Sequence, residues 1–597
     1  MTHPTSQPIR LRDSLAVARL ARLQHFLTGT TSRGFDLRTL FWLALSLGFS
    51  AYFASQALHH AFISQYVVQD DARQHVFWME RFLDPQLFPR DVIADYFQSV
   101  APSGYSALYH VMALAGVDPL LLNKLLPMVL GLITSAYCFG ACLRMLPVPA
   151  AAFLSSLLLN QSLWMQDDLV SATPRAFLYP IFLAFLYYCL RGAALRCLAA
   201  IALQVLFYPS IGFILATILI LRLFDWDSKG LRLSRDRRNY ILCAAALGIF
   251  TLILLFYARK SSGFGPVVTG SEAEAMPEFS TEGRMRFFHP GFWSFWFTGT
   301  NSGMTPTSSL LPLTICFGLL LPILLRYSKR FPLVKQIASN IRLLPQVALA
   351  SVLMFVAAHL FLFKLYLPNR YTQHSIRIIL SLASGIALMV ILDAVFHWTE
   401  RRFKSHLSLR YLLAAGSTAL LAIALFEYPG SPRDFMQPKY RVGKESQLYE
   451  YFAQQPKDIL IASLSREASK LPVFSKRSNL VSWEAGLPFH KRYYGEIRQR
   501  AIDLINAQYS PDLNELRGFI QKYGIDFFLV DRHAFTPDYV ASDKWILMYQ
   551  PEAAAAMKRL ERGDMPALST LMQKCSDFQD DGFIVVKAEC VMKESPE

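Results

Sequence analysis

Long apolar runs alternate with short polar, basic segments over the first two thirds of the chain. The first run covers residues 40–63, which is long enough to cross a bilayer at ~20 residues per crossing. The pattern predicts a mainly α-helical, polytopic transmembrane helix bundle of about eleven spans. The later runs lie at residues 119–143, 148–165, 175–190, 195–207, 208–224, 239–257, 308–325, 343–366, 372–396 and 409–427.

The pattern changes after residue 428. Residues 458–463 and 525–530 have the length and composition of short buried strands, and residues 494–508 and 511–523 have the periodicity of amphipathic helices. We therefore expect three parts. They are a basic cytoplasmic segment at 1–38, a transmembrane domain at 39–428 and a soluble α/β domain at 429–597.

The distribution of charge predicts the orientation. If the N-terminus is cytoplasmic, every strongly basic loop falls on the cytoplasmic side, as the positive-inside rule requires. The carboxylate-bearing loops 64–118, 166–174 and 258–307, together with the tail, then fall outside. The first 38 residues lack a short apolar core followed by a cleavage site, so we expect the first span to be the insertion signal. This topology, without an organelle address, favours a bacterial inner membrane with a periplasmic tail.

Composition argues against several classes of protein. The chain is 53% hydrophobic and only 17% charged, which is too apolar for an ordinary soluble protein. Its net charge of +15 would suggest nucleic-acid binding in a soluble protein, but the lysines and arginines lie between apolar runs. We therefore expect contacts with membrane lipids and none with nucleic acid. The sequence has no glycine-rich phosphate loop, paired CxxC or HExxH motif, which argues against a nucleotide-driven pump, a zinc site and a metalloprotease.

The cysteines fall into two groups. Six lie in or beside apolar runs, where a free cysteine behaves as a small hydrophobic residue. Cys575 and Cys590 lie in the tail and flank the strand-like residues 582–587. They would pair as a disulfide in an oxidising compartment, and would remain two free thiols otherwise.

Two adjacent carboxylates, Asp70 and Asp71, follow the first span. Either could simply cap residues 72–83, which have the pattern of an amphipathic helix on the membrane surface. Two carboxylates are more than one cap needs, and an ionised carboxylate at this position could act as a general base. The second outer loop repeats this chemistry with Asp167 and Asp168.

Several cations lie near the outer ends of predicted helices. Arg175 follows Thr173 and Pro174, a good helix start, at the end of the helix dipole that disfavours a cation. A bound anion would compensate it, or its side chain could extend toward water.

A second group of cations lies in the segment 364–377. If Asn369 caps the helix, Arg370, His374 and Arg377 share one face. An ionisable residue inside an apolar run usually faces an acidic partner or a watery cavity. Because guanidinium groups match phosphate geometry, we predict a phosphate or carrier site, with a structural ion pair as the alternative. The predicted residues of this site are Arg175, Lys364, Arg370, His374 and Arg377.

The order of these features resembles the GT-C superfamily of membrane glycosyltransferases. The resemblance rests on Asp70 and Asp71 after the first span, Asp167 and Asp168 in the second outer loop, a late outer loop and a soluble C-terminal domain. The WWDYG-type motif of oligosaccharyltransferase catalytic subunits is missing, since residues 481–486 (VSWEAG) are only loosely similar. The chain therefore looks closer to bacterial transferases that modify lipids, glycans or proteins one sugar at a time.

The resemblance implies a sugar donor linked to polyprenyl phosphate and an acceptor in the cell envelope. Asp70 or Asp71 would take the acceptor's proton, and the arginines would stabilise the departing lipid phosphate. Mg²⁺ or Mn²⁺ could be held by Asp71 and Asp168, although the superfamily also contains metal-independent members. A transporter or flippase of a lipid-linked saccharide, or a catalytically silent assembly protein of the same fold, are the alternatives; the absence of visible symmetry between two halves argues against a transporter.

Overall fold

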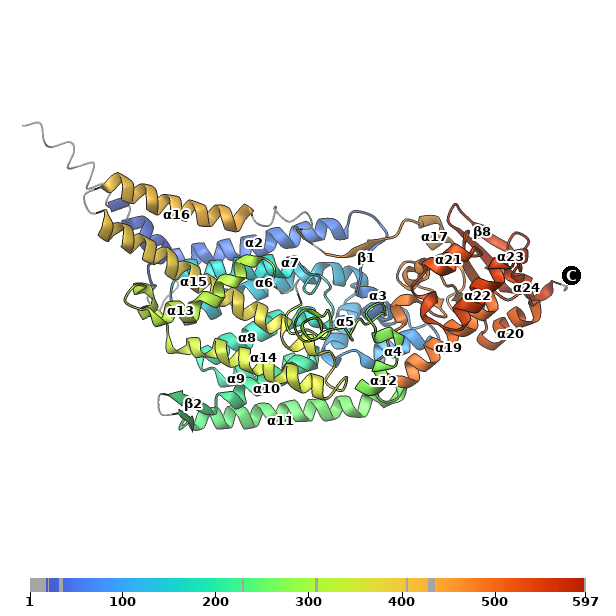
Figure 1. Ribbon diagram of the computed structural model, residues 1–597, viewed down its shortest axis with the longest axis horizontal. Helices are drawn as coiled ribbons and strands as arrows, with labels where there is room; N and C mark the ends of the chain where they lie inside the picture. The colour runs from blue at the N-terminus through green and yellow to red at the C-terminus, as the bar shows by residue number, and fades with distance from the viewer. Residues whose placement is uncertain are drawn as a thin grey trace, which may run out of the picture.

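The computed structural model describes residues 18–19, 21–31, 36–227, 230–306, 310–403, 406–427, 435–436 and 438–594. The rest of the predicted N-terminal segment 1–38 lies outside the described residues. The molecule is elongated, with a helix bundle at one end and an α/β domain at the other (Figure 1). The predicted mainly α architecture with a C-terminal sheet is confirmed.

Each predicted apolar run coincides with helical structure. The helices of the bundle are α2 (Leu37–Ala61), α6 (Pro119–Met145), α7 (Pro149–Trp164), α8 (Leu178–Arg191), α9 (Ala194–Phe207), α10 (Pro209–Leu221), α11 (Arg237–Lys260), η7 (Leu313–Leu320) with α13 (Leu321–Arg326), α14 (Leu343–Leu360), α15 (Gln373–Arg402) and α16 (Leu407–Glu427).

Six segments among the described residues are long and apolar enough to cross a membrane, so the predicted count of about eleven spans is not confirmed. Three further apolar helices, α9, α10 and the η7–α13 segment, are shorter. The six segments are Leu37–Ala61, Pro119–Met145, Arg237–Tyr257, Ser339–Leu360, Pro368–Arg402 and Leu407–Glu427.

Local sequence explains where several helices begin. Asp36 accepts a hydrogen bond from the backbone amide of Thr39 at the start of α2, and Asp118 does the same for Leu121 at the start of α6. Pro209 cannot continue α9 and instead occupies the first turn of α10, which explains the break at residues 208–210.

The helices differ in how much protein surrounds them. The apolar part of α15 is 78% buried, whereas that of α16 is only 11% buried. Figure 1 shows α11 and α16 along opposite edges of the bundle. A mainly apolar helix that stays exposed in the protein alone fits a lipid-facing position, while α15 lies inside the bundle.

The predicted surface helix at residues 72–83 is wrong. The chain forms a short helix α3 (Ala72–His75) and a 3-10 helix η1 (Phe77–Phe82), and Val76 to Met79 are fully buried. The aromatic side chains here pack on several sides, against α4 (Val92–Val100) and α5 (Ser103–Leu114) among others, so this segment is part of the protein core.

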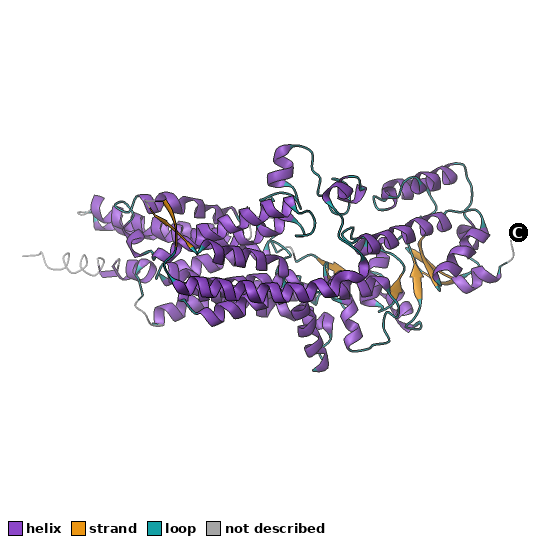
Figure 2. Cartoon of the chain, turned by 90° about the horizontal axis from the view of Figure 1, so that it is seen from below, coloured by secondary structure: helices purple, strands orange, loops and turns teal. Residues whose placement is uncertain are grey.

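The tail forms an α/β domain around a five-stranded sheet in the order β6-β5-β7-β9-β8 (Figure 2). Strands β5, β6 and β7 are parallel, and β9 runs antiparallel to β7 and β8. The strands are β5 (Leu460–Ala462), β6 (Ser478–Asn479), β7 (Phe527–Asp531), β8 (Ser576–Gln579) and β9 (Phe583–Lys587). The helices are α17 (Ser446–Gln454), α18 (Leu471–Phe474), α19 (Lys491–Gln508), α20 (Leu513–Tyr523), α21 (Pro537–Ser542), α22 (Glu552–Glu561), α23 (Ala567–Leu571) and α24 (Ala588–Lys593).

A two-stranded sheet joins the two ends of the molecule. Strand β1 (Val67–Gln69), directly before the first acidic motif, pairs antiparallel with β4 (Tyr440–Val442), which leads into the α/β domain. The pairing fixes the acidic motif against a segment about 370 residues away in the chain. A second two-stranded sheet, of β2 (Phe224–Asp227) and β3 (Gly230–Leu233), lies at the far end of the bundle (Figure 1).

Cys575 and Cys590 form a disulfide, with their Cα atoms 5.5 Å apart. The bond closes a 15-residue segment that contains β8 and β9. Replacing both cysteines by serine should lower the free energy of unfolding of the α/β domain by about 3 kcal/mol, as expected for a loop of this length. The melting temperature of the full chain would be measured for the double-serine variant and for the wild type with and without reductant. If neither the substitutions nor the reductant changes the melting temperature, the prediction is contradicted.

Candidate functional site

The first acidic motif lies where the bundle meets the α/β domain. Asp70 and Asp71 follow β1 directly, and Asp71 stands at the N-terminal boundary of α3 without a side-chain capping bond. The capping alternative therefore does not account for Asp71. Instead, the Oε1 atom of Gln69 accepts a hydrogen bond from the backbone amide of Asp71 at 2.8 Å, which orders the turn.

The two adjacent carboxylates have different surroundings. Asp70 is bound by Arg73 and by the Nε atom of Arg441, the latter at 2.8 Å. Burial acts to raise the pKa of Asp70, but these two guanidinium groups outweigh it and the pKa is lowered. Asp70 is therefore held as an ion-paired carboxylate.

Asp71 is more open. Its side chain is 29% exposed, and its Oδ2 atom lies 2.5 Å from Nη2 of Arg175. Among the described residues no side chain donates a hydrogen bond to its Oδ1 atom. Burial raises the pKa of Asp71; Arg175 opposes this shift, and the nearby charges of Asp167 and Asp70 reinforce it. Of the four carboxyl groups in the two motifs, only Asp71 has a raised pKa.

Asp168 is enclosed by polar side chains from α8 and α15. Its side chain is 5% exposed, and its Oδ2 atom accepts hydrogen bonds from Tyr179 at 2.8 Å and from Nη1 of Arg377 at 2.7 Å. His374 lies 3.4 Å away through Nδ1. Burial acts to raise the pKa of Asp168, but His374, Arg377 and Arg175 hold it well below its usual range.

Arg175 connects the two acidic motifs. Its Nη2 atom also lies 3.0 Å from Oδ2 of Asp167, and its Nη1 atom lies 3.6 Å from Oδ1 of Asp168. Lys439, from the segment before β4, contacts the same Asp167 oxygen at 3.1 Å. Burial acts to raise the pKa of Asp167, but Arg175 and Lys439 outweigh it and the pKa is lowered.

Arg370 remains a cation without an anionic partner among the described residues. It lies on the 3-10 helix η10 (Pro368–Tyr371), before α15, so Asn369 is not the cap of a continuous helix as predicted. Its Nε atom is buried and has no hydrogen-bond partner in the described chain. Burial keeps the pKa of Asp71 raised, and the charge of Arg370 acts in the opposite direction, so the two groups interact electrostatically. Lys364 is exposed and makes no ion pair with a described residue.

Several residues of this region were not predicted from the sequence. Lys439 and Arg441 were not recognised, although their basic character just after the last span was a visible signal. Glu484 was also missed. It binds Arg73 at 2.9 Å and Arg284 of the late outer loop at 2.7 Å, so the loosely WWDYG-like segment lies beside Asp70.

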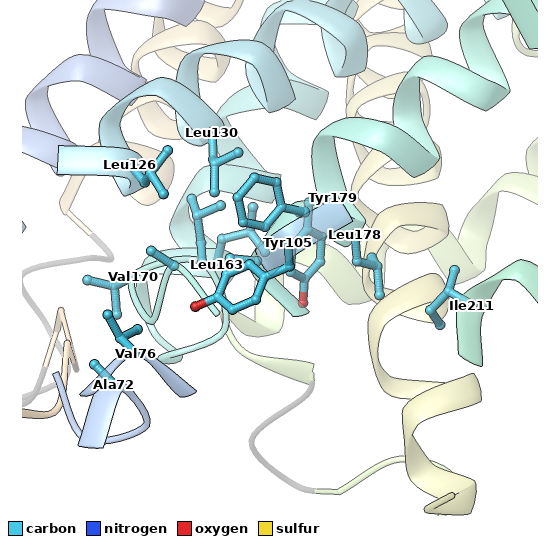
Figure 3. Close-up of a cluster of buried hydrophobic side chains, with 14 of the residues drawn as sticks. Ala72, Val76, Tyr105, Leu126, Leu130, Leu163, Val170, Leu178, Tyr179 and Ile211 are labelled. Carbon is cyan, nitrogen blue, oxygen red and sulfur yellow. The ribbon is translucent and has the colours of Figure 1, made fainter. Parts of the chain in front are cut away.

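Apolar side chains that follow the two acidic motifs in the chain belong to one buried cluster. Figure 3 shows Ala72 and Val76, which follow Asp71, beside Val170, which follows Asp168. All three side chains are fully buried. Because densely packed side chains allow little displacement, this cluster holds the two acidic loops in one relative position.

Arg377→Ala should lower the stability of the bundle strongly, by about 3–5 kcal/mol, because it leaves Asp168 as a buried charge without its closest partner. The melting temperature of the purified full chain in detergent measures this. A double variant, Asp168→Asn with Arg377→Ala, should recover part of the loss. A wild-type melting temperature for Arg377→Ala would contradict a stabilising role for the ion pair with Asp168.

The acidic motifs have the right donor chemistry for Mg²⁺ or Mn²⁺, since both ions prefer carboxylate oxygens. Their arrangement does not fit such an ion, because the guanidinium of Arg175 lies between the carboxylates. Within the described parts of the chain, the group of three potential ligands that converges is Cys575, Cys590 and Glu594, and its two cysteines form the disulfide.

No protein-family model and no curated protein matches the sequence. Solved structures do match. The archaeal oligosaccharyltransferase AglB from Archaeoglobus fulgidus, in complex with an inhibitory peptide and a dolichol-phosphate, aligns over 87% of this chain and 72% of its own, with 13% identity and a TM-score of 0.51.

Two further structures of the Archaeoglobus fulgidus oligosaccharyltransferase align similarly. The apo form covers 86% of this chain and 72% of its own, with 13% identity and a TM-score of 0.50. The complex with Zn and sulfate covers 86% and 70%, with 14% identity and a TM-score of 0.50. At this level of identity the similarity concerns the fold alone: the chain shares the overall fold of these oligosaccharyltransferase structures.

Proposed function

We propose that this protein is an integral-membrane glycosyltransferase that moves a sugar from a polyprenyl-phosphate carrier to an acceptor outside the cytoplasm. The observation that carries the proposal is the arrangement of Asp71 and Arg370. A partly exposed carboxylate, whose Oδ1 atom receives no hydrogen bond from a described residue, lies within electrostatic range of a guanidinium that has no anionic partner in the described chain.

These two groups suit the two ends of a displacement at an anomeric carbon. The Oδ1 atom of Asp71 accepts the proton of an acceptor hydroxyl while the hydroxyl oxygen attacks the carbon. The bond from this carbon to the phosphate oxygen breaks, and the electron pair leaves with the lipid phosphate. Arg370 stabilises the charge that develops on that phosphate.

The donor class is proposed from two independent supports. Arg370 and the buried Nε atom of Arg175 offer hydrogen-bond donors to an anion of phosphate type. The structurally similar AglB binds a dolichol-phosphate, which is an isoprenoid lipid phosphate of the same chemical class. The acceptor belongs to the lipids, glycans or proteins of the cell envelope.

In the proposed topology the site lies at the periplasmic surface of the inner membrane. The basic loops then face the cytoplasm, and the α/β domain faces a bacterial periplasm. The distribution of cysteines supports this orientation, since Cys575 and Cys590 form a disulfide in the α/β domain while the cysteines of the bundle are free thiols. Structural disulfides persist in oxidising compartments such as the periplasm.

The test is a transfer assay with the purified full chain, labelled polyprenyl-phosphate sugars and envelope acceptors. Label should move from the carrier to the acceptor, with release of polyprenyl phosphate. Movement of the carrier between leaflets of a vesicle, without transfer from any donor, would identify a flippase and refute the proposal. Accessibility labelling of an engineered cysteine in the α/β domain would test the orientation separately.

A further inference from the structure

Three carboxylates from two separate loops converge on a single guanidinium group. The Nη2 atom of Arg175 lies 2.5 Å from Asp71 and 3.0 Å from Asp167, and its Nη1 atom lies 3.6 Å from Asp168. Arg175 itself is held on the short helix η2 (Pro174–Phe177), which follows the second acidic loop directly. One cation therefore lies at the position where the two acidic motifs meet.

The cluster is balanced in charge without a further cation. Three carboxylates face three side chains that carry full positive charge: Arg175 in the middle, Arg377 on Asp168 and Lys439 on Asp167. A divalent ion added here would leave two excess positive charges in a largely buried site. Isolated charge is costly to bury, so the existing cations would oppose its binding.

The geometry leads to the same conclusion. Mg²⁺ binds oxygen ligands at about 2.0–2.1 Å in a nearly ideal octahedron. In this cluster Oδ2 of Asp71, Oδ2 of Asp167 and both oxygens of Asp168 face nitrogen atoms. The described residues contain no trio of carboxylates whose oxygens lie together as a ligand set. The guanidinium also retains a buried Nε atom without a hydrogen-bond partner in the described chain. This leaves a donor for an anionic ligand.

We propose that Arg175 takes the place of a divalent cation in this site and that sugar transfer is metal-independent. The inference rests on the proposed function for its catalytic half, while its structural half concerns the site alone. Arg175 supplies the positive charge between the two acidic motifs and holds Oδ2 of Asp71, which leaves Oδ1 for the acceptor. The charge on the leaving phosphate is stabilised by Arg370 and by the remaining donor of Arg175.

The first experiment is a titration of the metal-stripped full chain with Mn²⁺, followed by electron paramagnetic resonance of the free ion. The wild-type protein should bind no Mn²⁺ at the site more tightly than about 1 mM, an affinity that would correspond to only about 4 kcal/mol. Stoichiometric micromolar binding that is lost in Asp71→Asn would overturn the inference. This result does not depend on any transfer activity.

A variant provides the positive test. Arg175→Gln removes the central cation and leaves three carboxylates facing one another, so it should gain Mn²⁺ binding by at least about tenfold over the wild type. The matched control is Arg441→Gln, which removes a cation from Asp70 outside the cluster and should gain none. Equal gains in both variants would contradict a specific role for Arg175. If Arg175→Gln does not fold, the wild-type titration still shows whether the site binds a divalent cation.

The transfer assay supplies a second arm. EDTA should leave the wild-type rate unchanged within about twofold, whereas a loss in EDTA that Mn²⁺ or Mg²⁺ restores would overturn the inference. If no donor supports transfer at all, the proposed function fails. The Mn²⁺ titration still tests whether Arg175 excludes a divalent cation from the site. The two failures are therefore distinguishable.

Discussion

Asp71→Asn should lower kcat for sugar transfer by about 10²–10⁴, the usual contribution of a positioned general base. The substitution keeps the size of the side chain but removes its ability to accept the acceptor's proton. KM for the lipid donor should change little, because the base contacts the acceptor. Steady-state kinetics with a labelled polyprenyl-phosphate sugar would measure both constants.

The same group should control the acid limb of the pH profile. The raised pKa of Asp71 means that the carboxyl becomes protonated at a higher pH than an ordinary aspartate. A general base must be deprotonated, so activity is present above this pKa and falls as the pH drops through it. The acid limb should be absent from the residual activity of Asp71→Asn.

Asp70→Asn is the matched control. Asp70 is held by Arg73 and Arg441 and has a lowered pKa, which makes it a poor base. The variant should reduce stability through the loss of these ion pairs and retain at least about a tenth of the transfer rate, well above a variant without its base. If Asp70→Asn abolishes transfer while Asp71→Asn is active, the roles assigned to the two carboxylates are reversed.

Arg370→Ala should lower kcat/KM for the donor by about 10²–10³, the cost of removing one donor that stabilises developing charge. Arg370→Lys should recover only part of this loss, because a lysine keeps the charge but not the planar fork that matches phosphate. Inhibition of transfer by polyprenyl phosphate, measured in the same assay, should weaken in parallel.

A suitable control for Arg370 is Arg562→Ala, which removes an exposed arginine from the α/β domain. It should leave donor kinetics unchanged. Wild-type kcat/KM in Arg370→Ala would remove this residue from the phosphate-binding role. Partial loss in kcat with unchanged inhibition by polyprenyl phosphate would indicate that Arg370 acts on Asp71 instead of on the carrier.

The pattern of apolar positions predicted the helices well, because a helix that spans a membrane must be mainly apolar along its whole length. The predicted count of about eleven crossings is not confirmed, since six segments among the described residues are long and apolar enough to cross a membrane. Helix α7 is buried along its whole length, and most of α8 is buried as well. A helix that faces protein and a helix that faces lipid are equally apolar, so composition alone does not distinguish them.

The candidate site shows a similar division. Asp71 and Asp168 were selected as members of paired carboxylates, Arg175 as a cation at a predicted helix start, and Arg377 as a charge inside an apolar run. Their pairing was not foreseeable. Whether Arg377 binds a phosphate or Asp168 depends on the packing of α15 against the second acidic loop, which lies about 200 residues earlier in the chain.

The sequence by itself determined that the chain enters a membrane, that two acidic motifs follow apolar spans, and that an α/β domain follows the last span. These properties depend on local composition and short-range periodicity. Only the tertiary structure decided which carboxylate is open, which arginine connects the motifs, and which arginine has no acidic partner among the described residues. Those properties depend on distances between segments far apart in the chain, and the β1–β4 pairing and the packing of the helices set these distances.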